Sequence, residues 1–136
     1  MKKIIISLIS AIVLTFAIFC VLFFIALQRG PSIDTLSKRV CQSLMVDPAS
    51  IRYLGGKNGR EPSVFFELSG NIHETADVRV LKGWAKDHNV RLFNNLALAH
   101  GIPYNATDDL LNYKGDIYDL YLVKTASGYC VLYYGF

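Results

Sequence analysis

The chain begins with one long uncharged segment and continues with shorter stretches in which apolar and polar residues alternate. Residues 4–27 contain no charged residue, no proline and no glycine. A transmembrane helix needs about 20 predominantly apolar residues to cross the hydrocarbon core of a bilayer. The segment is therefore long enough to span a membrane, and we expect residues 1–30 to form a short head and a single transmembrane helix.

A cleaved signal peptide is the main alternative for this segment, because Lys2 and Lys3 suit the charged start of either kind of signal. The apolar core of a signal peptide has about 7–15 residues and ends at a small-x-small cleavage site. This run is longer, and cleavage after Ala17 would leave the apolar residues from Ile18 onward as the new N-terminus. These features favour an uncleaved signal anchor.

The orientation of the anchor does not follow from charge alone. Lys2 and Lys3 precede the segment, whereas Arg29, Lys38 and Arg39 follow it, so the positive-inside rule does not choose between them. A short N-terminal head is easily kept in the cytoplasm, and the cysteines after the anchor suit an oxidising compartment. We predict a cytoplasmic N-terminus in the inner (plasma) membrane and a periplasmic or extracellular C-terminal domain.

Residues 31–136 have the size of one ordinary domain with one core. The chain has 14 basic and 11 acidic residues, but Lys2, Lys3 and Arg29 flank the apolar segment, which leaves 11 of each sign in this domain. A neutral domain does not have the basic footprint of a nucleic-acid-binding protein. The charge balance therefore favours other partners.

The start of the domain has the periodicity of an amphipathic helix. Ser32 is an expected N-cap, and the helix should end before Asp47-Pro48. The apolar residues recur every three or four positions at Ile33, Leu36, Val40 and Leu44. This spacing predicts that one face of the helix packs on the core.

Two short strands and a second helix are expected next. Residues 51–54 and 64–68 have strand character, and the glycine-rich residues 55–59 predict a loop between them. Thr75 is an expected cap for a helix that continues to about His88. Its core-facing residues would be Val78, Leu81, Trp84 and Ala85. Residues 91–100 predict either a further helix or an apolar connection.

The end of the chain has the clearest strand pattern. Residues 117–124 and 129–134 are rich in β-branched and aromatic side chains, and residues 125–128 have the composition of a turn. Alternation places Tyr118, Leu120 and Leu122 on one face and Tyr121 and Val123 on the other. The sequence thus predicts an α+β fold, in which helices pack on an antiparallel sheet.

Two cysteines, Cys41 and Cys130, lie beyond the anchor, and we expect them to form a disulfide. The bond would close a long loop and would stabilise the domain by about 4–5 kcal/mol in the chain-entropy model. The alternative is that both are buried free thiols.

No catalytic or metal-binding pattern is visible. The three histidines, His73, His88 and His100, lack the spacing of a zinc site. No serine lies in a G-x-S-x-G motif, and the glycine-rich residues 55–60 do not match a phosphate-binding loop. We therefore predict no enzymatic activity and no cofactor, and the sequence does not indicate a small-molecule ligand.

Tyrosines concentrate in the C-terminal hairpin and suggest an interaction surface. The predicted partner-binding residues are Tyr118, Tyr121, Tyr129 and Tyr133. Aromatic side chains are enriched in protein interfaces. The alternative is that helices cover both faces of the sheet and bury these rings.

Three functional hypotheses follow, and the least favoured is an envelope enzyme that would use His73, His88 or His100 with a carboxylate. The first is a membrane-anchored, extracytoplasmic protein-binding module, such as an inhibitor or an immunity-like protein, with a protein partner in the envelope. The second is a structural or accessory subunit of a secretion, division or transport complex that assembles through its transmembrane helix. Small residues at Ser7, Ser10, Ala11 and Ala17 would permit close helix packing in that case.

Overall fold

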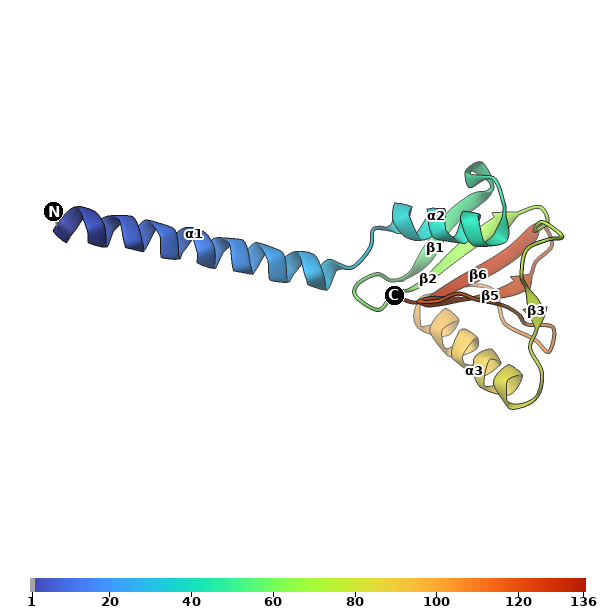
Figure 1. The fold of residues 1–136 in the computed structure, drawn as a ribbon. Helices are drawn as coiled ribbons and strands as arrows, with labels where there is room; N and C mark the ends of the chain where they lie inside the picture. The colour runs from blue at the N-terminus through green and yellow to red at the C-terminus, as the bar shows by residue number, and fades with distance from the viewer. Residues whose placement is uncertain (1) are drawn as a thin grey trace.

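A computed structural model describes residues 2–136, except for the side chains of residues 27–29. It consists of a long N-terminal helix, α1 (Lys2–Arg29), and a domain built on one antiparallel sheet. Helix α1 projects away from the domain, and one helix covers each face of the sheet (Figure 1). The predicted mixture of helices and antiparallel strands is therefore confirmed.

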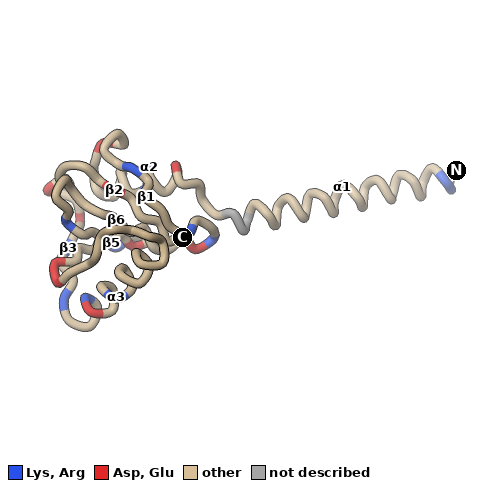
Figure 2. The backbone as a smooth tube through the Cα atoms, turned by 180° about the vertical axis from the view of Figure 1, so that it is seen from behind, with Lys and Arg blue, Asp and Glu red and all other residues tan. Residues whose placement is uncertain are grey.

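Helix α1 makes no packing contact with the domain along its apolar length. Residues 2–26 form the one helix, within the described part of the chain, that is long enough and apolar enough to cross a membrane, and none of that span is buried. An anchor and a signal sequence both have these properties. No charged residue interrupts the helix between Lys3 and Ala26 (Figure 2).

Helix α2 (Ile33–Leu44) forms as its periodicity predicts. The hydroxyl of Ser32 accepts a hydrogen bond from the backbone N–H of Thr35 at 3.2 Å, which confirms the predicted N-cap. The helix ends where Met45 adopts a left-handed conformation with φ of 55°. The backbone N–H of Val46 then donates to the carbonyl of Cys41 at 3.1 Å, so one of the free carbonyls of the last turn is satisfied.

A short 3₁₀ turn (Pro48–Ser50) leads from α2 into the sheet. The strands are β1 (Ile51–Lys57), β2 (Ser63–Ser69), β3 (Arg79–Val80), β4 (Leu111–Lys114), β5 (Tyr118–Lys124) and β6 (Gly128–Gly135). All neighbours are antiparallel, in the order β1-β2-β6-β5-β4-β3. The predicted C-terminal hairpin is therefore confirmed, and it forms the centre of the sheet.

The two faces of the sheet bury separate apolar clusters. Under α2, the core contains Leu36, Val40, Leu44, Val64, Phe66, Leu68, Leu120, Leu122, Val131 and Tyr133. On the opposite face, under helix α3 (Gly83–Ala99), it contains Phe65, Phe93, Ala97, Ile102, Ala106, Leu110, Tyr121, Val123, Cys130 and Leu132. The predicted alternation along β5 is confirmed.

The prediction that a helix starts at Thr75 is wrong. Residues 70–78 instead form an irregular loop with a turn at Glu74 and Thr75, in which the backbone N–H of Thr75 donates to Nδ1 of His73 at 3.1 Å. Helix α3 begins eight residues later, at Gly83, and continues through the predicted 91–100 segment to Ala99. Val78 and Leu81 therefore lie outside this helix.

Strand β1 is longer than predicted because it includes Gly55 and Gly56. The pairing with β2 shifts between Tyr53 and Gly55, which indicates a β-bulge. A Cβ atom at Gly56, where φ is 130°, would overlap the carbonyl oxygen of Ser63. Glycine is therefore required at this position for the two strands to pair.

Candidate functional site

The four tyrosines predicted to bind a partner do not form an exposed surface. Tyr133 is fully buried and Tyr121 is 7% exposed. Tyr118 and Tyr129 are partly buried against the core under α2. Helices α2 and α3 cover the two faces of the sheet. The hairpin tyrosines are therefore buried or partly buried, which is the alternative stated above.

These tyrosines instead help to dock α2. The rings of Tyr118 and Tyr133 stack with centroids 4.7 Å apart. The guanidinium of Arg39 donates to the hydroxyl of Tyr133 at 2.8 Å and to the carbonyl of Phe136 at 2.7 Å. The Tyr133 hydroxyl also donates to that carbonyl, at 2.6 Å. The polar edges of the aromatic cluster are thus satisfied within the domain.

The predicted disulfide is absent, because Cys41 and Cys130 are free thiols on opposite sides of the sheet. Cys41 belongs to α2, whereas Cys130 belongs to the cluster under α3. Burial, followed by the nearby carboxylate of Glu67, raises the pKa of the Cys130 thiol to about 12. Burial also raises the pKa of Cys41. Both thiols stay protonated at neutral pH, which makes them poor nucleophiles.

The three histidines lie in separate parts of the domain. His73 accepts a hydrogen bond in the turn before β3, His88 is on α3, and His100 follows the end of α3. Among residues 2–136, no three histidine, cysteine or acidic side chains are grouped so that they could hold a metal ion.

A shallow hollow of about 310 Å³ lies at the end of the sheet far from α1. It is lined by Ala49, Ser50, Ile51, Arg52, Glu67 and Ser69. Arg52 and Glu67 form an ion pair there, and the hydroxyl of Tyr104 donates to the second oxygen of Glu67 at 3.3 Å. The carboxylate in this hollow is therefore already neutralised by neighbours in the domain.

The outer face of α3 is the most distinctive surface of the domain. Its residues Trp84, His88, Arg91, Asn95 and Leu98, here called the α3 stripe, follow one another at intervals of four, three, four and three. This spacing places them on one side of the helix, opposite the buried Phe93 and Ala97. The stripe therefore points to solvent over the full length of α3.

The two ends of the stripe are large exposed apolar side chains. Trp84 is 73% exposed and Leu98 is 83% exposed. The start of α3, with Trp84, lies at the end of the domain away from α1, and the end of the helix, with Leu98, lies nearer to α1 (Figure 1). The stripe therefore combines two apolar ends with a polar centre.

The indole of Trp84 is held in place by a neighbour on the same helix. Its ring stacks on that of His88, with centroids 4.9 Å apart and planes 12° apart. This stacking favours one orientation of the indole, which lowers the rotamer entropy that binding would remove.

The charges beside Trp84 are mainly positive. Lys82, the N-cap of α3, and Arg91, within the helix, are both exposed, whereas Lys86 pairs with Asp108 at 3.3 Å and with Asp87 at 3.6 Å. Hydrogen bonding to Asp108 raises the pKa of Lys86 and keeps it charged. Lys82 and Arg91 make no ion pair within the described residues, so they are available to an acidic partner.

The sequence did not identify Trp84 as a surface residue. The helix predicted from Thr75 placed this ring on the core side together with Val78 and Leu81, but these two residues precede α3 and so do not define a face of it. Once α3 is known to begin at Gly83, the spacing of the residues from Trp84 to Leu98 identifies its exposed face.

Comparisons with protein-family models, with curated proteins and with solved structures found no match to this chain.

Proposed function

We propose that this protein is a membrane-anchored, extracytoplasmic protein-binding module that uses the α3 stripe as its recognition surface. In this proposal α1 is an uncleaved single-pass anchor, the N-terminus is cytoplasmic, and residues 31–136 face the periplasm or the cell exterior. The partner is a protein of the same envelope, as expected for an inhibitor or an immunity-like protein.

The exposure of Trp84 is the observation that carries the proposal. Tryptophan is enriched among the few interface residues that supply most of the binding energy. Burying an indole in a partner removes a large apolar area from water, whereas leaving it 73% exposed gains nothing for the fold. The complementary partner surface is an apolar pocket for Trp84 with acidic groups facing Lys82 and Arg91.

The stripe also lies on a rigid element. Phe93 packs edge-on against Phe65 of β2, with ring centroids 5.3 Å apart, and Asn94 accepts a hydrogen bond from the backbone N–H of Ala106 at 2.6 Å. These contacts fix the opposite side of α3 to the sheet. A partner would therefore meet a preformed helix face.

Site-specific photocrosslinking in living cells tests the proposal. A photoreactive amino acid at Asn95, inside the stripe, is expected to give one dominant adduct, and Trp84→Ala is expected to abolish it. The same amino acid at Lys38, an exposed position on α2, is the matched control and should give no such adduct. Because Trp84 is largely exposed, Trp84→Ala should change the unfolding free energy by less than about 0.5 kcal/mol.

Crosslinks from α1 would distinguish the second hypothesis. If an adduct forms only from a photoreactive residue at Phe16 and is unaffected by Trp84→Ala, the protein is a subunit assembled through its transmembrane helix. An adduct at Asn95 that survives Trp84→Ala would contradict the proposed recognition surface.

A further inference from the structure

The end of the domain nearest α1 is held close to the end of that helix. Only residues 30–32 separate α1 from α2. Gly30 adopts φ of 65°, and a Cβ atom there would overlap the carbonyl oxygen of Gly59 in the loop between β1 and β2. The connector therefore lies directly against this loop, and the C-terminal end of β6 lies at the same end of the domain (Figure 1).

Two exposed apolar side chains lie at this end of the sheet. Ile117 is 51% exposed and Phe136 is 53% exposed. The backbone N–H of Phe136 donates to the carbonyl of Ile117 at 3.0 Å, which keeps the two residues side by side. Ile117 lies in the turn before β5 and Phe136 directly follows β6, so both are held by the centre of the sheet.

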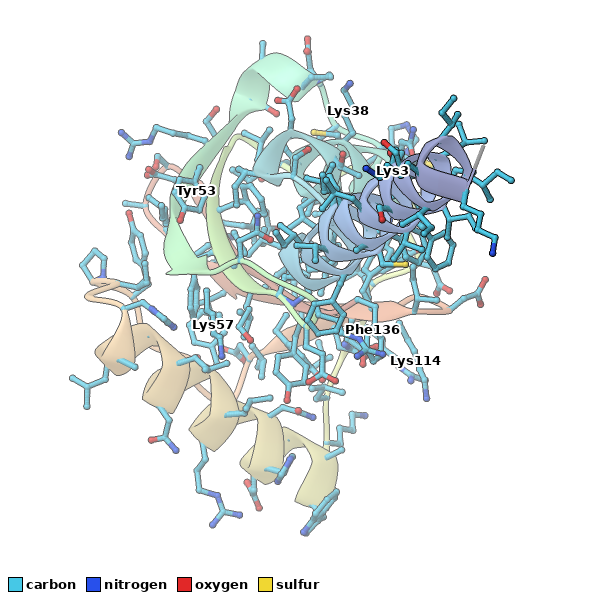
Figure 3. All side chains as sticks on the ribbon, turned by 90° about the vertical axis from the view of Figure 1, so that its left-hand side faces the viewer. Lys3, Lys38, Tyr53, Lys57, Lys114 and Phe136 are labelled. Atoms are coloured by element: carbon cyan, nitrogen blue, oxygen red, sulfur yellow. The ribbon has the colours of Figure 1, made fainter. Side chains whose placement is uncertain are left out.

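Cations surround this apolar pair. Lys57, Arg60 and Lys114 are exposed at the same end, whereas Glu61 and Asp116 supply the acidic groups of these loops. Lys57 and Lys114 lie at opposite ends of one row of paired residues that crosses β1, β2, β6, β5 and β4. Figure 3, which views the molecule from the side of α1, shows Lys57, Lys114 and Phe136 around this end of the domain.

We propose that this end of the domain rests on the bilayer that α1 crosses, with Lys57, Arg60 and Lys114 contacting anionic lipid headgroups and Ile117 and Phe136 entering the interface. The inference depends on the membrane anchor of the proposed function but not on the α3 stripe. A Lys or Arg side chain is attracted to an anionic membrane surface. That attraction is reduced here by Glu61 and Asp116, and by Asp119, whose position on β5 pairs with Lys114.

A weak contact is sufficient because the domain is tethered. The short connector keeps the basic end at a high effective concentration relative to the headgroups, so the interaction does not have to bring the protein to the membrane. Such contact would fix the domain's orientation and leave Trp84, at the far end, accessible to a partner in the aqueous compartment.

The single tryptophan of the chain permits a direct test. The full-length protein is reconstituted into phosphatidylcholine vesicles with or without phosphatidylglycerol, and tryptophan emission is quenched with brominated lipids. In the Trp84→Phe, Phe136→Trp variant, the reporter at position 136 should show a blue shift and a loss of emission in the anionic vesicles. Native Trp84 should show neither. If the tryptophan at position 136 is no more quenched than native Trp84, the proposal is overturned.

Charge variants test the headgroup contact. In the Phe136→Trp background, Lys57→Glu combined with Lys114→Glu should remove the quenching, whereas Lys124→Glu, an exposed lysine at the far end of β5, should not. Quenching that persists in the double variant overturns recognition of anionic headgroups. Vesicle flotation in alkaline carbonate checks α1 separately, because a chain that does not float lacks the anchor and so contradicts the proposed function itself.

Discussion

At the residue scale, Asp119 is a carboxylate whose surroundings disfavour its charge. Its position on β5 is paired with Tyr134 on one side and Lys114 on the other. Burial raises the pKa of Asp119, and Lys114 and Arg79 only partly oppose this effect. The folded state therefore binds the Asp119 proton more tightly than the unfolded state does.

The sign of this shift predicts a pH-dependent effect of Asp119→Asn. Because the folded pKa is raised, the proton bound by Asp119 favours the folded state at low pH, and this advantage is lost as pH rises through the folded pKa. Asp119→Asn should therefore stabilise the protein at pH 7 and have no effect below the ordinary carboxyl pKa. Solvent screening limits the gain to less than about 1 kcal/mol.

Urea unfolding of the full chain in detergent micelles, at pH 7 and at pH 3, measures this difference. Asp116→Asn is the control, because Asp116 is an exposed carboxylate in the adjacent turn. A lower unfolding midpoint for Asp119→Asn than for the native protein at pH 7 would show that the charge is net stabilising.

At the element scale, α2 is held mainly by its apolar face and only secondarily by polar contacts. Leu44 is fully buried, whereas the Tyr133 hydroxyl forms hydrogen bonds with Arg39 and Phe136. Leu44→Ala should cost 2–5 kcal/mol of unfolding free energy, as large-to-small core substitutions do. Tyr133→Phe should cost about 0.5–1.5 kcal/mol, the usual net contribution of a hydrogen bond.

Chemical denaturation of both variants compares the two contributions. Ser43→Ala is a matched control for Tyr133→Phe, because it removes a second hydrogen bond between α2 and the sheet, to the hydroxyl of Tyr118. Equal losses for Tyr133→Phe and Leu44→Ala would mean that the polar bridge, rather than apolar packing, holds α2 in place.

The elements also show which features the sequence could predict. Helix α2 has both a capping residue and a regular apolar period, and it forms where expected. Helix α3 has no such start signal, because Lys82 makes no side-chain capping bond and Gly83 has φ of 62°. Thr75 is of a residue type that often caps helices, but here it forms hydrogen bonds with His73 instead.

The candidate site was less predictable than the fold for a related reason. Strand alternation identifies which residues share a face, but it does not say which helix covers that face. The strand pattern therefore permits either burial or exposure of the hairpin tyrosines. The predicted disulfide between Cys41 and Cys130 is wrong because the sheet lies between the two residues. The exposure of Trp84 was missed because Val78 and Leu81, which defined the predicted core face of its helix, lie outside α3.

At the scale of the whole molecule, the position of the domain relative to α1 depends on one glycine. Gly30 combines a left-handed backbone with a close approach to the loop at Gly59. Gly59 itself has open space around the position of a Cβ atom. Alanine should therefore be tolerated at position 59 but should force the connector away from the loop at position 30.

This contrast predicts that Gly30→Ala loosens the placement of the domain without unfolding it, whereas Gly59→Ala does neither. Spin labels at the exposed Cys20 and at Lys124→Cys, an exposed position outside the proposed lipid contact, report the distance between α1 and the domain by pulsed electron paramagnetic resonance, while Cys41 and Cys130 are buried. Gly30→Ala should broaden the distance distribution, because residues 30–32 would no longer be fixed against the β1–β2 loop. An unchanged, narrow distribution would mean that contact with the bilayer, rather than the connector, sets the orientation of the domain.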